Sequence, residues 1–309
     1  MAMSLNRQAE LGHQRNWIWR GWPVRYTYFG AIAPSPAPPM LFLHGFGASI
    51  GHWRHNLKVF GQDRPVYGLD LLGFGASAKA YARYGTDFWV EQVHDFWQAV
   101  IRRPVVLVGN SLGSSVSLGV AARHPEIMAG LVMINLPDVS VIDLGVPPGL
   151  KALLRPVAAI AKLPLRILQG IATSPPLFSP FFYGLRHPRM IRLWARQAYA
   201  SPEALTPELL AILTRPAYEA GAGRALAAMV RAPKPSPELL ARTALPRIQH
   251  PVLLMWGEKD SMVPPTLATQ FQTLSERIQL VMLTDAGHCP HDECPDPVNA
   301  QIQQWLATL

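Results

Sequence analysis

The sequence predicts an α/β fold with a mostly parallel central sheet, helices on both faces and a helical lid inserted in the middle of the chain. Short apolar runs of strand length alternate with longer segments of helical character along most of the 309 residues. The runs are apolar throughout, as expected for parallel strands that helices cover on both faces. The alternation stops near residue 135 and resumes at residue 251. One run, residues 105–108, ends abruptly at Gly109-Asn110-Ser111-Leu112-Gly113.

The elements of this pattern can be placed in order. Residues 1–16 are polar and unpatterned, which predicts a frayed lead-in. Residues 17–29 alternate aromatic and β-branched residues around Gly21-Trp22-Pro23, which predicts a β-hairpin. Short buried strands are expected at residues 40–43, 65–69, 105–108, 131–134, 251–256 and 278–283. Helices are expected at residues 52–60, 86–101, 114–123, 267–274 and 297–306. Thr86 or Asp87 is the expected N-cap of the second helix.

The interruption divides the chain into three segments. Residues 1–136 and 249–309 form the expected sheet domain, and residues 137–248 form a helical lid (cap) inserted after the strand at about 131–134. Such a lid lies over the carboxyl ends of the strands, where open α/β sheets bind ligands. Most of its large apolar side chains are expected to be packed. Among them are Leu153, Leu163, Phe178, Phe181, Phe182, Tyr183 and Trp194.

Composition limits the class of protein and its setting. Apolar residues make up 49% and charged residues 16% of the chain, which indicates a globular protein with a substantial core. No run of about 18 apolar residues is free of charge and proline, so no transmembrane helix is expected. The first twenty residues lack the apolar stretch of a secretory signal. With only Cys289 and Cys294 as thiols, we expect an intracellular, soluble protein.

The net charge of +8 is confined to the inserted segment. Residues 138–247 contain fourteen Lys or Arg and six Asp or Glu, whereas the two charge types balance in the rest of the chain. No nucleic-acid-binding motif accompanies this excess, so a nucleic acid is not an expected partner. Peripheral contact of the basic lid with an anionic membrane is the expected partnership. The alternative is a solvated basic face that only keeps the protein soluble.

Ser111 has the sequence context of a catalytic nucleophile. A strand before Gly-x-Ser-x-Gly and a helix after it form a nucleophile elbow, which holds the serine hydroxyl in the open at a tight turn. Gly109 and Gly113 are expected at its flanks because a Cβ there would collide with neighbouring backbone. The following helix directs its N-terminal amides at the place where an oxyanion would form.

A base and an acid for Ser111 follow later in the chain. His288 lies on a small-residue loop after the strand at 278–283, from which it can reach the serine. Glu258 and Asp260 both follow the strand at 251–256, where a buried acid can orient the histidine. We choose Asp260 because Glu258 has the character of an exposed turn residue. The order Ser, Asp, His is the one expected for this kind of fold.

The oxyanion hole needs two amide donors. The amide of Leu112, directly after the nucleophile, is one candidate. The other is the amide of Phe46, because Gly45 and Gly47 let the loop after the strand at 40–43 turn inward. His44 is expected to shape this loop through hydrogen bonds and not to act as a second base.

The run His288-Cys289-Pro290-His291-Asp292-Glu293-Cys294 has the residue types of a metal site. Its prolines and close spacing oppose a tetrahedral Cys/His site, and the chain offers no second ligand pair in the sequence. No metal and no cofactor are therefore expected.

With these residues placed, the chain resembles the α/β-hydrolase superfamily over about residues 20–309. The motifs that carry the resemblance are His44-Gly45-Phe46-Gly47, Gly109-Asn110-Ser111-Leu112-Gly113, Trp256-Gly257-Glu258-Lys259-Asp260 and Gly287-His288. Other stretches are similar to the plant and cyanobacterial branch that contains pheophytinase and chlorophyll dephytylase. These are residues 51–56, 70–77, 108–113 and 288–293. Ser114 departs from the second glycine that many members have after the elbow.

The resemblance implies a cofactor-independent serine hydrolase that cleaves a carboxylic ester, in this branch the phytyl ester of chlorophyll or pheophytin. It also implies chlorophyll catabolism at a photosynthetic membrane. Dehalogenases and epoxide hydrolases of the fold carry an aspartate at the elbow, so Ser111 argues against both. Carbon–carbon bond hydrolases and general carboxylesterases stay open, although the former commonly have tryptophan at the position of Cys289. An alternative of another class is a non-catalytic binding protein, against which the intact Ser, Asp and His count.

Overall fold

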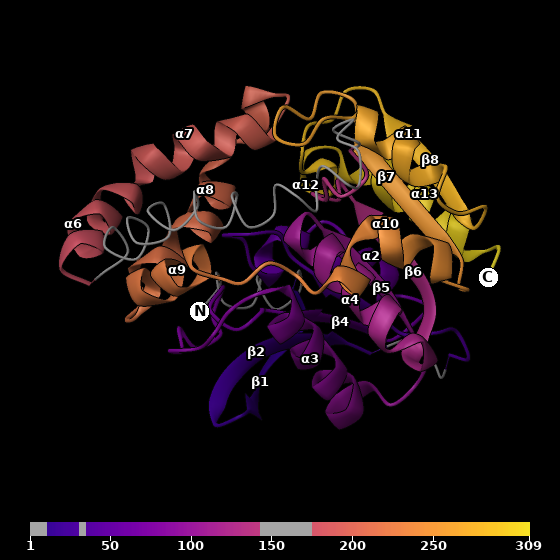
Figure 1. Ribbon diagram of the computed structural model, residues 1–309, viewed down its shortest axis with the longest axis horizontal. Helices are drawn as coiled ribbons and strands as arrows, with labels where there is room; N and C mark the ends of the chain where they lie inside the picture. Colours follow the sequence, from indigo (N-terminus) through magenta and orange to yellow (C-terminus); the bar gives the residue numbers. More distant parts are fainter. Residues whose placement is uncertain (1–10, 31–34, 143–174) are drawn as a thin grey trace, which may run out of the picture.

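In the computed structural model, described for residues 11–30, 35–142 and 175–309, an eight-stranded sheet is covered by helices and carries further helices at one side (Figure 1). The strand order is β1-β2-β4-β3-β5-β6-β7-β8. β2 is antiparallel to β1 and β4, and all other neighbours are parallel. The strands span His13–Trp19, Trp22–Phe29, Met40–Leu43, Val66–Leu69, Val105–Asn110, Met128–Ile134, Val252–Gly257 and Ile278–Leu283, in chain order from β1 to β8. The predicted α/β-hydrolase sheet is confirmed.

The N-terminal hairpin is longer than predicted. β1 begins at His13, so residues 13–16 belong to a strand and not to a lead-in. Their side chains are exposed because β1 is an edge strand, and they therefore lack the apolar alternation that marks a strand in the sequence. The turn is made by Arg20 and Gly21 with φ of 49° and 83°, the left-handed pair that matches strand twist in two-residue hairpins.

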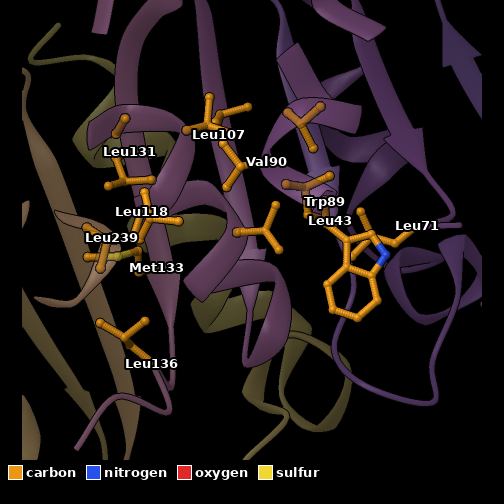
Figure 2. Close-up of a cluster of buried hydrophobic side chains, with 14 of the residues drawn as sticks. Leu43, Leu71, Trp89, Val90, Leu107, Leu118, Leu131, Met133, Leu136 and Leu239 are labelled. Carbon is orange, nitrogen blue, oxygen red and sulfur yellow. The ribbon is translucent and has the colours of Figure 1, made fainter. Parts of the chain in front are cut away.

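Alternate residues of the parallel strands point to opposite faces of the sheet and pack into two separate cores. Leu41 and Leu43 of β3 face one side, where they pack with the helices α3 (Thr86–Phe96), α4 (Leu112–Arg123) and α11 (Thr266–Gln272). Met40 and Phe42 face the other, beneath α2 (Leu57–Phe60) and α13 (Pro295–Leu306). Figure 2 shows the first core, in which Leu43, Leu107, Leu131 and Met133 of three strands meet Val90 and Leu118 of α3 and α4. Both faces of the sheet are thus buried beneath helices, which explains the uninterrupted apolar runs of its strands.

Two predicted helices differ from the structure. In place of one helix over 52–60 there is a 3₁₀ turn, Ile50–Trp53, followed by α2. Between them Asn56 donates to the carbonyl of His291 and to Asn299 Oδ1, so tertiary contacts outweigh helix propensity here. α3 begins at Thr86 without a side-chain cap, and a π-turn (Trp97–Ile101) completes it. Asp87 does not cap, because its carboxylate accepts hydrogen bonds from Ser236 and Arg123.

The described part of the insertion contains two layers. α6 (Pro175–Leu185) packs on α9 (Ala222–Val230), and α7 (Pro188–Ala198) packs on α8 (Pro207–Thr214), which in turn contacts the Ile50–Trp53 turn. The last short helices, Pro237–Leu239, α10 (Ala241–Ala244) and Leu245–Arg247, pack against α4 within the first core. The division at residues 136 and 248 stays a prediction, but this end of the insertion lies with the sheet domain.

The large apolar residues of the insertion differ in how far they are buried. Phe178 and Phe182 are buried between α6 and α9, as expected of packed residues. Phe181, Tyr183 and Trp194 are exposed, contrary to that expectation. Leu153 and Leu163 lie outside the described residues. Among the helices of the described ranges, none has both the length and the apolar character needed to cross a bilayer.

Candidate active site

Ser111 lies at the strained turn between β5 and α4. Its φ of 53° and ψ of −116° are outside the favourable regions for a residue with a side chain. The turn is tight enough to require both flanking glycines. A Cβ on Gly109 would lie 2.3 Å from the carbonyl carbon of Gly113, and one on Gly113 would lie 2.0 Å from the carbonyl oxygen of Leu43. α4 begins at Leu112, two residues earlier than predicted, so the helix N-terminus lies directly at the serine.

Three strand ends bring Ser111, His288 and Asp260 together. The Ser111 hydroxyl lies 2.8 Å from His288 Nε2, and His288 Nδ1 lies 2.7 Å from Asp260 Oδ2. The serine follows β5, the aspartate follows β7, and the histidine follows β8. His288 and Asp260 are buried, whereas Ser111 is partly exposed. This chain of contacts allows a proton to pass from the serine to the imidazole beside a carboxylate.

Asp260 is surrounded by donors that favour its charged form. Oδ2 accepts from Asn135 Nδ2 at 2.6 Å, and Oδ1 accepts from the amides of Met262 and Val263 at 2.8 and 2.9 Å. Burial alone acts to raise the pKa of Asp260, but the hydrogen bond and charge of His288, with those donors, hold the pKa below its ordinary value. Glu258, the other candidate, is exposed at the surface.

The predicted oxyanion donors lie on either side of the nucleophile. Leu112 is the first residue of α4, so its amide has no acceptor within the helix. The loop after β3 runs beside the serine, since a Cβ on Gly45 would lie 3.5 Å from Ser111 Cβ. Gly47 adopts a φ of 74°, which turns this loop. Phe46 packs edge-on against Phe74 but leaves 58% of its surface exposed. The role of both amides stays a prediction.

Both ring nitrogens of His44 form contacts that hold the loop after β3. Its Nδ1 lies 2.8 Å from the carbonyl oxygen of Gly45, and its Nε2 accepts from the amide of Leu71 at 3.1 Å. Burial lowers the pKa of His44 to about 4, so the ring is neutral and can donate at one nitrogen and accept at the other. These contacts join the loop after β3 to the loop after β4, and the loop-shaping role of His44 stays a prediction.

Ser114, the departure from the family pattern, has a partner for its hydroxyl. Oγ lies within donating distance of the carbonyl oxygens of Gly109 and Ile134, at 2.7 and 2.9 Å, and accepts from the amide of Ile134 at 3.0 Å. It thereby links the carboxyl end of β5 to that of β6. A glycine at this position makes no such link.

A second buried polar group was not found from the sequence. It joins the core to the lid and consists of His52, Arg54, Tyr199, His291 and Asp292, hereafter the His52 cluster. The Tyr199 hydroxyl lies 2.7 Å from His52 Nε2 and donates to Asp292 Oδ2 at 2.7 Å. Arg54 Nη1 pairs with Asp292 Oδ1 at 2.6 Å, and His291 Nε2 lies 3.3 Å from His52 Nδ1. All five residues are buried.

The lid is also bonded to the loops that carry the catalytic candidates. The His288 amide donates to the carbonyl of Ala198, the last residue of α7, at 2.8 Å. The Ser261 hydroxyl donates to the neighbouring carbonyl of Gln197 at 2.7 Å. Gly287 makes room for this contact, because a Cβ there would lie 2.7 Å from the amide of Ala200. The end of α7 is therefore bonded to the backbone of His288 and to the Ser261 side chain on the loop of Asp260.

One group of three metal-ligating side chains among the described residues has ligand atoms close enough together to hold an ion, and it lies away from Ser111. Ligand atoms of His94, His124 and Glu126 are within 4.8 Å of one another. The two imidazole rings are stacked with centroids 3.8 Å apart and planes within 10°. Because lone pairs lie in the ring planes, a single ion cannot meet both rings in this arrangement. In the run after His288, both cysteines are free thiols, and burial raises the pKa of Cys289 well above its usual value.

Comparisons of sequence and fold show which known proteins this chain is similar to. A family model described as the alpha/beta hydrolase family matches residues 40–301. Chloroplastic pheophytinase of Arabidopsis thaliana is 26% identical over 88% of this chain, which spans only 62% of that relative. A 2-hydroxymuconate semialdehyde hydrolase of a Pseudomonas species is 29% identical, covering 82% of this chain and 80% of its own. The crystal structure of a bacterial membrane phospholipase A has a TM-score of 0.74 at 24% identity, covering 99% and 89% of the two chains.

Proposed function

The chain belongs to the alpha/beta hydrolase family, and on this premise we propose that it is a serine hydrolase that cleaves a carboxylic ester through Ser111, His288 and Asp260. The observation that carries the proposal is the pair of contacts at 2.8 and 2.7 Å that join the serine hydroxyl, the imidazole and the carboxylate. The strained backbone at Ser111 and its partial exposure further support the role of nucleophile.

The proposed reaction has two steps. Ser111 attacks the ester carbonyl while His288 accepts its proton at Nε2 and then passes it to the leaving alcohol. Asp260 holds Nδ1 of His288 protonated and stabilises the positive imidazolium. Amides of Leu112 and Phe46 stabilise the tetrahedral oxyanion, each worth about 3 kcal/mol of the barrier. Water, activated in turn by His288, then releases the acid from the acyl-enzyme.

For the substrate we propose a large hydrophobic ester, such as the phytyl ester of chlorophyll or pheophytin. The support is the 26% identity to pheophytinase over 88% of this chain, together with the exposed Phe46 beside the nucleophile. On this proposal the protein acts in chlorophyll catabolism, intracellularly and at a photosynthetic membrane. A protein that only binds such a ligand would not need the strained serine or the buried acid.

A second candidate is hydrolysis of a carbon–carbon bond. It is favoured by the 29% identity to 2-hydroxymuconate semialdehyde hydrolase, which extends over 80% of that protein's length. Both reactions pass through an attack on a carbonyl group, so the same serine, histidine and aspartate serve either one. They differ in the leaving group, which is an alkoxide in one and a carbanion in the other.

The test compares substrates and a serine variant. The protein is incubated with chlorophyll, pheophytin, p-nitrophenyl esters and a vinylogous 1,5-diketone, and products are separated by chromatography. Release of phytol by the wild type, lost in Ser111→Ala, supports the full proposal. Turnover of short esters alone removes the pigment as substrate, and turnover of the diketone alone selects the second candidate. Wild-type ester hydrolysis by Ser111→Ala would show that the mechanism is wrong.

A further inference from the structure

The outer helices of the lid expose an unusual combination of side chains. Residues 175–198 contain four arginines and no acidic residue. Large apolar and basic side chains of α6 and α7 are exposed together; these are Phe181, Tyr183, Arg189, Arg192, Leu193, Trp194 and Arg196, hereafter the α6–α7 face. Phe181 and Trp194 leave 59% and 56% of their surface in solvent. Soluble proteins rarely gather large apolar side chains on one exposed element without a partner.

The position of these helices makes the face accessible. α6 and α7 lie at the outer edge of the molecule and pack on α9 and α8, and the end of α7 reaches the loops of His288 and Asp260 (Figure 1). On α7 the buried residue is Ala195, which belongs to a small core that the lid shares with Cys289 of the sheet domain. Arg189, Arg192 and Arg196 recur at spacings of three and four residues, so they lie along one side of the helix beside Leu193, whereas Trp194 lies on the opposite side.

The arginines of α7 have no acidic partner within the described part of the chain. None of the guanidinium groups of Arg189, Arg192 and Arg196 forms an ion pair with a described residue. The fourth arginine, Arg186, lies over the rings of Tyr183 and Tyr218 at 4.2 and 4.6 Å, which keeps these aromatic side chains beside the positive charge. Three arginines without an ion pair among the described residues thus lie on α7, and exposed aromatic side chains lie elsewhere on the same two helices.

We propose that the α6–α7 face is the surface by which this protein docks on an anionic lipid bilayer. Arginine side chains bind lipid phosphates, and tryptophan, tyrosine and phenylalanine settle at the level of the headgroups. The absence of acidic residues from residues 175–198 favours a uniformly anionic surface, and a protein partner, which would use the same residue types, is an outcome of the test. The docking stands apart from the proposed chemistry; only its use, to reach an ester held in the membrane, rests on the proposed function.

The same helix connects the docking surface to the catalytic candidates. The carbonyl of Ala198 at the end of α7 accepts from the His288 amide, and the carbonyl of Gln197 accepts from Ser261 beside Asp260. A bilayer bound along α7 is therefore held at a fixed distance from the histidine that bonds Ser111. This places the serine on the membrane side of the sheet, at the carboxyl ends of its strands.

The experiment uses the full chain and vesicles of phosphatidylcholine with and without phosphatidylglycerol, measured by co-sedimentation at two salt concentrations. The test variant is Arg189→Gln/Arg192→Gln/Arg196→Gln, and a second is Trp194→Ser. The matched control, Arg102→Gln/Arg247→Gln/Arg277→Gln, removes the same charge from exposed arginines before β5, β7 and β8, at the opposite end of the sheet. Hydrolysis of a water-soluble ester is recorded for each protein.

The wild type is expected to bind only vesicles that contain phosphatidylglycerol, more weakly at high salt. The test variant should bind about 100-fold more weakly, at roughly fivefold per arginine, and the control less than about threefold. Trp194→Ser should weaken binding at both salt concentrations alike. Hydrolysis of the soluble ester should be unchanged in all variants, which separates loss of docking from loss of catalysis.

Three results would overturn the proposal. One is wild-type binding that does not depend on the anionic lipid, and another is an equal loss in the test and control variants. The third is a wild type that ignores vesicles but forms dimers that the test variant cannot form, in which case the face joins copies of the chain. Vesicle binding by a protein that hydrolyses no ester would leave the docking proposal intact and contradict the proposed function.

Discussion

The molecule contains two buried groups built from the same residue types but in different arrangements. In each, a histidine lies within 2.8 Å of a hydroxyl and near an aspartate: Ser111, His288 and Asp260 in one, and Tyr199, His52 and Asp292 in the other. In the first group the carboxylate accepts only from neutral amides and the histidine. In the second, Arg54 is paired with the carboxylate at 2.6 Å.

The difference concerns where a positive charge can be placed. Asp260 carries an unpaired negative charge, so it can stabilise an imidazolium at His288 when the serine loses its proton. The charge of Asp292 is already balanced by Arg54, and burial lowers the pKa of His52, so a proton on that ring is unfavourable. The hydroxyl also differs, since Tyr199 is buried and burial raises its pKa well above the usual value. We therefore propose catalysis for the first group and attachment of the lid for the second.

The largest effect should come from the acid of the first group. Asp260→Asn is expected to lower kcat on a soluble ester by about 10⁴-fold, because an amide cannot keep Nδ1 of His288 protonated. The matched control is Glu258→Gln, which removes an exposed carboxylate two residues away and should change kcat less than about threefold. Steady-state kinetics with thermal melting separates loss of chemistry from loss of fold. Equal activity of the two variants would show that the acid is not Asp260.

The second group should instead control stability. Asp292→Asn leaves the buried Arg54 with Glu208, at 3.4 Å, as its one acidic partner among the described residues, and is expected to cost about 3 kcal/mol of unfolding free energy. Tyr199→Phe removes one hydroxyl from two buried partners and should cost about 1–3 kcal/mol. Tyr81→Phe, at a side chain that is 87% exposed, is the control and should change nothing measurable. Urea unfolding gives these values.

Kinetics of the same variants test the comparison directly. Folded Tyr199→Phe should keep kcat on a soluble ester within about tenfold, because the histidine and aspartate of the first group are untouched. If it loses activity as severely as Asp260→Asn while its unfolding free energy is unchanged, the two groups form one catalytic network and the distinction drawn between them is wrong.

The pH dependence of stability should also separate the groups. Burial lowers the pKa of His52 and that of His291, below the ordinary 6.5, so both rings stay neutral in the fold. The unfolded chain binds these protons as the pH falls below about 6.5, and stability is lost in that direction by up to about 1.4 kcal/mol per pH unit for each histidine. Asp70 has the opposite sign, since burial raises its pKa to about 6 and stability is lost as the pH rises through that value.

Urea unfolding between pH 7 and pH 5 isolates the contribution of His52 if wild type and His52→Gln are compared, because His291 is present in both proteins. The contribution of Asp70 is common to both proteins and cancels in the difference. The variant should lose less stability on acidification than the wild type. An equal or steeper loss in His52→Gln would mean that the ring is protonated in the folded protein, contrary to the assignment of this group.

The contrast also shows which features a sequence can reveal. Strands at Met40–Leu43 and Ile278–Leu283 were predicted to the residue, because uniform burial or a clear boundary marks their ends. The catalytic candidates were found because each follows a recognisable strand, and parallel strands end at one edge. His13–Trp19 was predicted too short because an exposed edge strand has no apolar pattern. The His52 cluster unites residues 52, 54, 199 and 291–292, whose contacts depend on how the lid folds back, and no local spacing records this.

The smallest expected effect concerns Ser114, which supports the first group without touching the histidine or the acid. Its hydroxyl links the ends of β5 and β6 through Gly109 and Ile134. Ser114→Ala should cost about 1–2 kcal/mol, since it removes a buried hydroxyl that is bonded to Gly109 and Ile134, and Ser114→Gly should cost about 1 kcal/mol more from added freedom of the unfolded chain. Both should keep kcat near the wild-type value. A kcat loss of a hundredfold in Ser114→Ala, at unchanged stability, would mean that this link positions Ser111 for reaction and belongs to the catalytic group.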